Sequence, residues 1–558
     1  MIFRNRYGRR RSLVRWTRRR MDALALATQG RPGLAHLVRV VRFPMRRVVV
    51  RFMSRALERP ELEQAKTIMA DAPPDPSQGP KVLFMTFRAW TSHAAWEVTI
   101  AQALRLRGAR CEFFFCGGGL PICEIGWPGE DRKTPCDSCG SYVAAMIDAA
   151  HFCRHSLDAF VPGEECASID RKVRTGFDAR RLDDAARQSL MWFFRSAHLP
   201  NTPTVEKARE DFRVGAAIMT AAAQRVLDAL VPDIVVMVNG LFYEDRLVRE
   251  AAKARGIRVV SYEVGAQAGT LYFSGERPAA EYDISELWDQ TRDQPLSLAS
   301  EAALDAVLSS RRSGTGLSRK YYARHRDLRT RGGVPLVAVF TNVSWDTAAT
   351  LASPAFGSMF DWVRETMAIA EAHPHLDFVI RAHPAESRWP GLETNESLET
   401  FVGCEFTCVP HNVRFVSARE AIDSYQLIEA ADIVSVFAST VGLEAAASGK
   451  PVCVAGMTHY RGRGFTLDVS SIAHYHELFD DLSWTQPDSR RRDLARRYAY
   501  SFFCRAMLPF GAVIEDEPSE PMLTYSSIND LEPGRDAVLD IICDGIVGRS
   551  SFSIDSRD

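Results

Sequence analysis

The sequence predicts an α/β protein with two Rossmann-like domains in tandem, and three observations support this fold class. The 558 residues are enough for two or three domains. A hydrophobic fraction of 46% and a charged fraction of 25% are ordinary for a globular protein, which excludes a mostly disordered, fibrous or multi-span membrane chain. Short apolar runs alternate with helical patterns that end in glycine, as in the βαβ units of a parallel sheet.

A basic extension, residues 1–80, precedes the first unit and ends in a proline-rich linker at 71–80. Its first sixty residues hold 17 arginines but only Asp22 and Glu58 as acids, although the whole chain has a net charge of −1. Arginine interleaved with Trp, Phe and Val suits an anionic membrane surface, where each Arg contributes roughly 1 kcal/mol. A poorly ordered tail and a nucleic-acid-binding arm are the alternatives, and we expect no nucleic acid.

Neither a signal peptide nor a membrane-spanning segment is visible, since no apolar run approaches the roughly 20 residues that a bilayer requires. We therefore expect a cytoplasmic protein that lies peripherally at the inner face of the membrane. The cysteines fit a reducing compartment, because they are scattered through apolar contexts rather than arranged as a disulfide framework.

The first domain is expected over residues 81–290. Residues 81–87 (KVLFMTF) have the length of a strand, residues 92–108 have helical spacing and end at Gly108, and 110–118 form a second strand. The same strand, helix and strand pattern recurs over 232–265. Residues 291–333 are polar and are expected to be a helical connector.

The second domain is expected over residues 334–485. Its predicted strands are 334–342, 376–384, 432–440 and 450–456, and its helices are 360–374, 417–431 and 440–449. An amphipathic helix follows at 488–509, so that 486–510 forms a C-terminal crossing segment, and 511–558 is a polar acidic tail. Two Rossmann-like domains followed by such a helix describe the GT-B architecture, in which the ligand binds in a cleft between the domains.

Polar side chains follow three strands of the second domain, where open α/β sheets bind their ligands. Serine and threonine hydroxyls at a helix N-terminus can bind an anion, and Arg and His can neutralise a phosphate. A glutamate one turn into the helix can accept hydrogen bonds from a ribose. Each residue taken singly also fits a helix cap, a structural hydrogen bond or a solvated surface position. The candidates for binding a nucleotide donor are Thr341, Asn342, Arg381, His383, Ser439, Thr440 and Glu444.

The motifs TNVSWDT, RAHPAE and STVGLEAAASGKPV resemble those of bacterial capsule and surface polysaccharide biosynthesis glycosyltransferases. The HP and ST pairs are similar to motifs of bacterial polysialyltransferases and of the β-Kdo transferases of capsule assembly. The resemblance covers about 81–510 and is strongest over 334–470. It implies that Arg381, His383, Ser439 and Thr440 bind the phosphate of a nucleotide sugar whose base the motifs leave open.

The resemblance further implies transfer of a sugar to a glycan or lipid-linked acceptor, with no divalent ion required. Two alternatives remain: a nucleotide-sugar 2-epimerase of the same fold, and a non-catalytic polysaccharide assembly factor. An inverting transferase needs a base that deprotonates the acceptor hydroxyl. His93 and Glu263 follow strands of the first domain and are our candidates, although a retaining enzyme would need no such base.

Four cysteines, Cys116, Cys123, Cys136 and Cys139, lie within 24 residues in the pattern C-x6-C-x12-C-x2-C. In a reducing compartment, such a group suits structural zinc or an iron–sulfur cluster. Free thiols in the core are the alternative, since the first pair is spaced too widely for a standard zinc knuckle.

Overall fold

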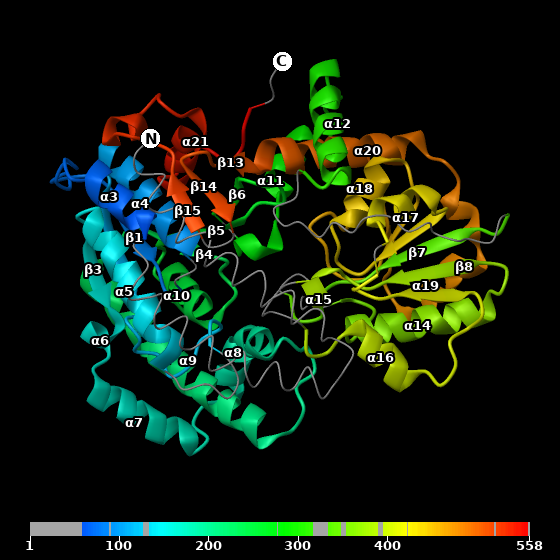
Figure 1. Ribbon diagram of the computed structural model, residues 1–558, viewed down its shortest axis with the longest axis horizontal. Coiled ribbons are helices and arrows are strands. Elements are labelled where there is room, and N and C mark those ends of the chain that lie inside the picture. Colours follow the sequence, from blue (N-terminus) through cyan, green and yellow to red (C-terminus); the bar gives the residue numbers. More distant parts are fainter. Residues whose placement is uncertain are drawn as a thin grey trace, which may run out of the picture. The chain divides into compact units, whose positions relative to one another are not determined.

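The computed structural model describes residues 59–88, 91–126, 133–275, 277–315, 333–346, 353–388, 394–420, 422–517 and 520–555. From Gln64 onward the chain forms one compact unit, whose described residues contain two large sheets flanked by helices and a two-stranded sheet (Figure 1). The arginine-rich segment 1–58, and with it the predicted membrane contact, lies outside the described residues. Within the described part, no helix has the length and apolar character needed to cross a bilayer.

The elements of the first half, in chain order, are α3 (Pro60–Ile68), β1 (Lys81–Met85), α4 (Thr91–Leu106), β2 (Arg110–Phe115), α5 (Lys133–Ala149), β3 (Cys153–Ser156), α6 (Leu157–Phe160), α7 (Gly163–Arg174), α8 (Ala179–Phe194), α9 (Pro203–Leu230), β4 (Ile234–Val238), α10 (Tyr243–Ala254), β5 (Arg258–Val264), β6 (Thr270–Ser274), α11 (Ser285–Thr291) and α12 (Leu298–Arg312). A short 3-10 turn, Ala279–Glu281, follows β6. The predicted strands at 81–87 and 110–118 are therefore present, and α12 confirms helix within the connector.

The N-terminal sheet has seven strands in the order β13-β6-β5-β4-β1-β2-β3. The five strands from β5 to β3 are parallel, whereas β6 pairs antiparallel with β5. Every residue of β4 is buried, as expected for a central strand covered on both faces. The direction of winding reverses between β1 and β4, and a ligand site in such a sheet lies beside this reversal.

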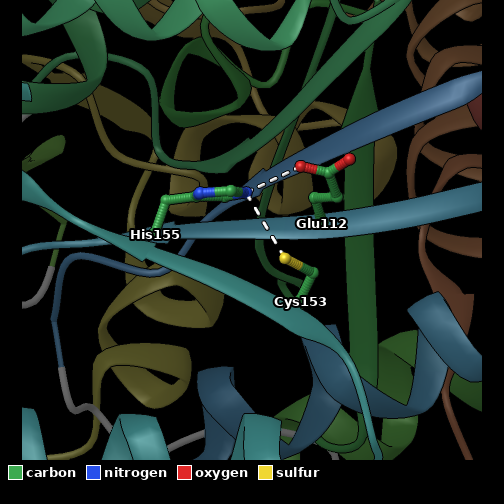
Figure 2. A group of neighbouring side chains, drawn as sticks. All are labelled: Glu112, Cys153 and His155. Carbon is green, nitrogen blue, oxygen red and sulfur yellow. Dashed lines mark hydrogen bonds and ion pairs between the residues drawn. The ribbon is translucent and has the colours of Figure 1, made fainter. Parts of the chain in front are cut away.

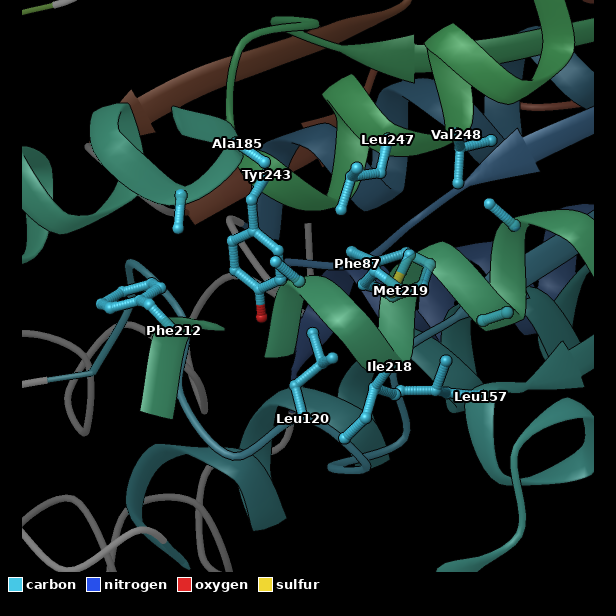
Figure 3. Close-up of a cluster of buried hydrophobic side chains, with 14 of the residues drawn as sticks. Phe87, Leu120, Leu157, Ala185, Phe212, Ile218, Met219, Tyr243, Leu247 and Val248 are labelled. Atoms are coloured by element: carbon cyan, nitrogen blue, oxygen red, sulfur yellow. The ribbon is translucent and has the colours of Figure 1, made fainter. Parts of the chain in front are cut away.

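Helices α8, α9 and α10 form much of the hydrophobic core of this domain (Figure 3). Phe212 and Met219 of α9 and Tyr243 and Val248 of α10 are almost completely buried. Burying each such side chain contributes roughly 1.5–3 kcal/mol. The four apolar side chains thus fix α10 on α9, and with it the loop that leads from β4 into α10.

The elements of the second half are β7 (Leu336–Phe340), α14 (Met359–Ala372), β8 (Asp377–Arg381), α15 (Ala385–Arg388), α16 (Leu398–Glu405), β9 (Val413–Val416), α17 (Ser424–Ala430), β10 (Ile433–Val436), α18 (Val441–Ala447), β11 (Val452–Val454), β12 (Leu467–Asp468), α19 (Ile472–Asp480), α20 (Ser489–Tyr500), β13 (Leu508–Pro509), β14 (Val513–Glu517), β15 (Glu520–Leu523) and α21 (Ala537–Ile546).

The C-terminal sheet is entirely parallel and has the strand order β12-β11-β10-β7-β8-β9. This is the order of a doubly wound dinucleotide-binding fold, with the reversal between β7 and β10. Separate hydrophobic clusters cover its two faces. The predicted Rossmann-like domain is confirmed, and its reversal point lies where the sequence places Asn342 and Ser439.

The segment after this domain returns to the first sheet. α20 continues as a π-helical turn, Ser501–Ala506, and β13 then pairs antiparallel with β6. The single helix expected over 488–509 therefore ends three residues early. Two Rossmann-like sheets, the first with five parallel strands and the second wholly parallel, are joined by this returning segment and confirm the predicted GT-B architecture.

The C-terminal region, which the sequence shows only as polar and acidic, is folded over residues 511–517 and 520–555. They contain the hairpin β14–β15 and the helix α21, whose Leu539, Ile542 and Ile546 are buried. Arg107, directly after α4, donates to the carbonyl oxygen of Leu531 at 2.8 Å, which joins this region to the N-terminal domain. The three apolar residues have helical spacing, but the acidic residues between them conceal that signal.

Candidate functional site

The three polar clusters predicted at strand ends come together at the reversal point of the C-terminal sheet. β7 lies between β8 and β10, so Asn342, His383 and Ser439 follow adjacent strands. The Asn342 side-chain oxygen accepts a hydrogen bond from the Ala438 backbone N–H at 2.9 Å, which links the end of β7 to the end of β10. Thr341 donates through Oγ1 to the Arg381 carbonyl at 3.1 Å and links β7 to β8 in the same way.

His383 is held in one orientation by the backbone that follows it. The Ala385 N–H donates to Nδ1 of His383 at 3.1 Å, so in the neutral imidazole the proton lies on Nε2. Burial, reinforced by the positive charge of Arg381, lowers the pKa of His383 to about 4. The imidazole is therefore neutral at physiological pH, and it would bind a phosphate as a hydrogen-bond donor rather than as a cation.

Ser439 and Thr440 form the half-buried turn between β10 and α18. Tyr460 donates through its hydroxyl to the Ser439 carbonyl at 2.6 Å and fixes this turn. The Thr440 side chain makes no capping hydrogen bond, so the reading of Thr440 as an ordinary helix cap does not hold. Ser439 Oγ accepts from the Val441 N–H at 3.3 Å, which means that this N–H, expected to be available to an anion, has a partner within the turn.

Arg381 is 2% exposed and contacts the protein rather than an open surface. Its guanidinium donates to the carbonyl oxygens of Ser417 at 2.6 Å and Ile422 at 3.3 Å. In this structure Arg381 therefore holds the loop after β9 and contributes positive charge beneath His383. The sequence pattern could not separate this position from a phosphate-binding arginine, because both follow a buried strand.

Glu444 is likewise occupied by protein donors. Its two carboxylate oxygens accept from Arg311 at 2.7 Å and from the Tyr425 hydroxyl at 2.9 Å, and its side chain is almost fully buried. The pair with Arg311 joins α18 to α12. Ribose binding by Glu444 stays a prediction, and it would require one of these contacts to exchange for the ligand.

In the N-terminal domain, the two predicted base candidates lie at the ends of β5 and α4. Glu263 is half-buried, and its Oε2 accepts from the Asn239 side-chain N–H at 2.8 Å. Asn239 has a φ of 61°, a left-handed backbone that aims its amide back toward β5. His93 is 9% exposed, and its Nδ1 lies 3.1 Å from the Tyr262 hydroxyl.

Behind His93 lies a buried carboxyl group that sequence analysis did not assign. The Tyr262 hydroxyl donates to Glu97 at 2.7 Å, so His93, Tyr262 and Glu97 form a continuous hydrogen-bonded chain. Burial raises the pKa of Glu97 to about 8, although hydrogen bonds from Thr86 and Tyr262 oppose the shift. Glu97 comes four residues after His93 in a predicted helix, so the sequence does place the two side chains on one helix face. It does not show that this face is buried, which is what perturbs the pKa of Glu97.

Arg88, directly after β1, is the second feature that sequence analysis missed. Its buried guanidinium pairs with Asp245, with Glu244 at 3.2 Å and with Glu124 at 3.6 Å. Burial raises the pKa of Asp245 to about 6 against the attraction of Arg88, and burial together with the charge of Glu124 raises the pKa of Glu244. One arginine thus fixes three acidic side chains near the reversal point of the N-terminal sheet.

Aromatic side chains join the carboxyl ends of the two sheets. The Trp192 ring, on α8, lies 5.4 Å from that of Phe242, which follows β4, and 4.8 Å from that of Trp345, which follows β7. Both contacts are edge-to-face, a favourable geometry for aromatic rings. The Arg88 guanidinium lies 4.8 Å from the Phe242 ring and extends this chain to the acidic cluster.

The four cysteines of the predicted metal site are free thiols located after β2 and in α5. Burial raises the pKa of Cys116 to about 12, and the nearby Cys139 and Cys136 add to the shift. Among the described residues, however, these four thiols do not form a group whose ligand atoms all lie within 4.8 Å of one another. Zinc or iron–sulfur binding by them stays a prediction.

Residues 318–492 match the family model of capsule polysaccharide biosynthesis proteins. A search of curated proteins finds no match. Among solved structures, the chain is similar to the β-Kdo 2,4-transferase KpsC of Thermosulfurimonas dismutans, with 16% identity over 53% of this chain and 86% of that one and a TM-score of 0.35.

Other similar structures differ in their chemistry. SnogD, a glycosyltransferase from Streptomyces nogalater, is 16% identical over 76% of this chain and 96% of its own, with a TM-score of 0.21. The UDP-GlcNAc 2-epimerase of Neisseria meningitidis is 11% identical over 76% and 99%, with a TM-score of 0.23. Likenesses at these scores do not separate a transferase from an epimerase.

Residues 318–492 therefore resemble capsule polysaccharide biosynthesis proteins, and the two Rossmann-like sheets agree with the predicted GT-B architecture.

Proposed function

We propose that this protein is a glycosyltransferase that moves a sugar from a nucleotide donor to a glycan or lipid-linked acceptor during capsule polysaccharide biosynthesis. One observation carries the proposal. The aromatic chain Phe242–Trp192–Trp345 joins two sheet edges, and each edge presents the groups that one half of the reaction needs.

The C-terminal edge supplies groups suited to the donor phosphates. Neutral His383 would donate its Nε2 proton, and the hydroxyls of Ser439 and Thr440 would donate beside it. As the donor bond breaks, negative charge develops on the leaving phosphate. Hydrogen-bond donors that the protein already holds in place stabilise this charge, because they do not have to reorient during the reaction. Transfer without a divalent ion stays a prediction.

The N-terminal edge supplies the candidates for a general base. Glu263 is half-buried and oriented by Asn239, so it can accept a proton from an acceptor hydroxyl. His93 is the second candidate, and the chain through Tyr262 to Glu97 would receive or return its proton. A retaining reaction, which needs no such base, stays open.

Nucleotide-sugar binding is the first test. Thermal shift of the full-length protein is measured with UDP-, GDP- and CMP-sugars, where donor at about 100 times its Kd adds about 2.7 kcal/mol of stability. We expect one base class to raise the midpoint, His383→Ala to abolish the shift, and His411→Ala, an exposed histidine of the same domain, to retain it. A shift that survives in His383→Ala would contradict the donor site.

Product analysis without an acceptor then distinguishes the alternatives. A 2-epimerase converts its nucleotide sugar without any acceptor, whereas a transferase leaves it intact or hydrolyses it slowly. No shift with any nucleotide and no conversion would favour the non-catalytic assembly factor.

We also propose that the arginine-rich segment 1–58 holds the enzyme at the anionic inner face of the membrane, where lipid-linked acceptors reside. Co-sedimentation with vesicles of anionic and of neutral lipids tests this. Binding should require anionic lipid and weaken as salt is raised, since the contact is electrostatic. Equal binding to neutral vesicles would exclude it.

A further inference from the structure

Three side chains with metal-binding chemistry meet on one face of the N-terminal sheet. β2 and the edge strand β3 pair in parallel, with Glu112 opposite Cys153. Cys153 and His155 are two residues apart, so both project from the same face of the strand. Figure 2 shows the three side chains converging, with dashed lines from the His155 ring to Glu112 and to Cys153.

The ligand atoms are close enough to share one ion. Nε2 of His155 lies 2.7 Å from Oε2 of Glu112 and 3.7 Å from Sγ of Cys153, and all three atoms lie within 4.8 Å of one another. With zinc–ligand bonds of about 2.0–2.3 Å, the ligand atoms of a tetrahedral site lie about 3.4–3.6 Å apart. The Cys–His distance already fits, and the Glu–His distance needs to open by about 0.7 Å.

The positive charge of Lys81 occupies one oxygen of the Glu112 carboxylate and leaves the other, Oε2, on the side of His155, where it can bind an ion. Lys81 Nζ lies 2.7 Å from Oε1 of Glu112, whereas Oε2 faces His155. Cys153 is exposed and the other two side chains are half-buried, so an ion and a water ligand can reach the site from solvent. Thiolate with imidazole favours zinc over the hard cations Mg²⁺ and Ca²⁺, which prefer oxygen ligands alone.

We propose that Glu112, Cys153 and His155 bind a zinc ion, with water completing its coordination. Such an ion would cross-link the edge strand β3 to β2. An edge strand has backbone groups without a strand partner on one side and is held by one neighbour only. The site is separate from Cys116, Cys123, Cys136 and Cys139, and it lies on a different part of the sheet from His93 and Glu263.

Cobalt and zinc titrations of the chelator-treated, full-length protein test the proposal. Cobalt should produce a sulfur-to-cobalt charge-transfer band that Cys153→Ser abolishes and that Cys404→Ser, an exposed cysteine of the C-terminal domain, leaves intact. His155→Gln should weaken zinc at least about tenfold in competition with a chromophoric chelator, because even outer-shell changes cost that much.

The cysteines after β2 require their own control, since they also could bind cobalt. Cys136→Ser should leave the Cys153-dependent band unchanged. In the Cys136→Ser background, a band that Cys153→Ser does not weaken, or the absence of any band, overturns the proposal. Zinc should also raise the Tm of the wild-type protein but not that of His155→Gln, and an equal rise in both overturns it as well.

Discussion

At the scale of single residues, Arg311 and Glu444 form a buried ion pair. The sequence motif that contains Glu444 suggested a ligand-binding role for this residue and did not indicate its partner. Arg311→Ala leaves the Glu444 carboxylate buried without its ion partner, which typically costs about 3–5 kcal/mol. We expect a loss of that size in the free energy of unfolding, measured by urea denaturation. Arg312→Ala, at an exposed position one residue on, should cost less than about 1 kcal/mol.

The double variant Arg311→Met, Glu444→Leu separates the contribution of charge to stability from the contribution of packing. Apolar replacement of both partners removes the buried charges together, so stability should return to near the wild-type value. A double variant as unstable as Arg311→Ala would show that the loss of stability does not come from the unpaired Glu444 charge.

Glu97 should make stability depend on pH. Its pKa is raised to about 8 in the folded protein from its ordinary value of 4.5, so the folded state binds the proton more tightly than the unfolded chain. The resulting stabilisation is complete below pH 4.5 and is lost as pH rises toward and through 8. Glu97→Gln should therefore flatten the decline in Tm between pH 5 and 8.

Glu399→Gln is the matched control for this profile, because Glu399 is exposed on the other domain. It should leave the wild-type decline unchanged. If Glu97→Gln and the wild-type protein decline equally, Glu97 ionises normally and cannot serve as a proton reservoir behind His93.

At the scale of elements, the parallel strands were predictable and the polar roles were not. The strands Ile234–Val238 and Leu336–Phe340 are continuous apolar runs that only a sheet covered on both faces accommodates. Arg88 and Arg381 show the limit of such reasoning. Both follow a buried strand, and only the fold reveals that their partners are acids or carbonyls of other segments.

Helix α21 tests whether the C-terminal region is part of the core. Ile542 is fully buried, and Ile542→Ala should cost about 2–5 kcal/mol of stability through lost contacts and the cavity left behind. The neighbouring Ile541 is half-buried, so Ile541→Ala should cost clearly less. Thermal or urea unfolding gives both values, and equal small losses would mean that α21 is not docked.

At the scale of the whole molecule, the Trp192 contacts join the donor and acceptor edges. Trp192→Ala should leave donor affinity unchanged while transfer falls about tenfold to a hundredfold, since misplacement of reacting groups costs that much. Trp192→Phe should recover part of the rate. Donor titration and turnover, measured on the same samples, would refute the prediction if affinity and rate fell together.

The pairing of β13 with β6 has a consequence for how the protein is made. The edge of the first domain is completed by Leu508 and Pro509, and Leu531 contacts its surface, so these segments are synthesised only after the second domain. The amino-terminal domain therefore cannot mature during its own synthesis. Until Leu508 and Pro509 have been synthesised, its sheet carries an open edge, and nascent chains stalled before residue 508 should depend on chaperones far more than the folded protein does.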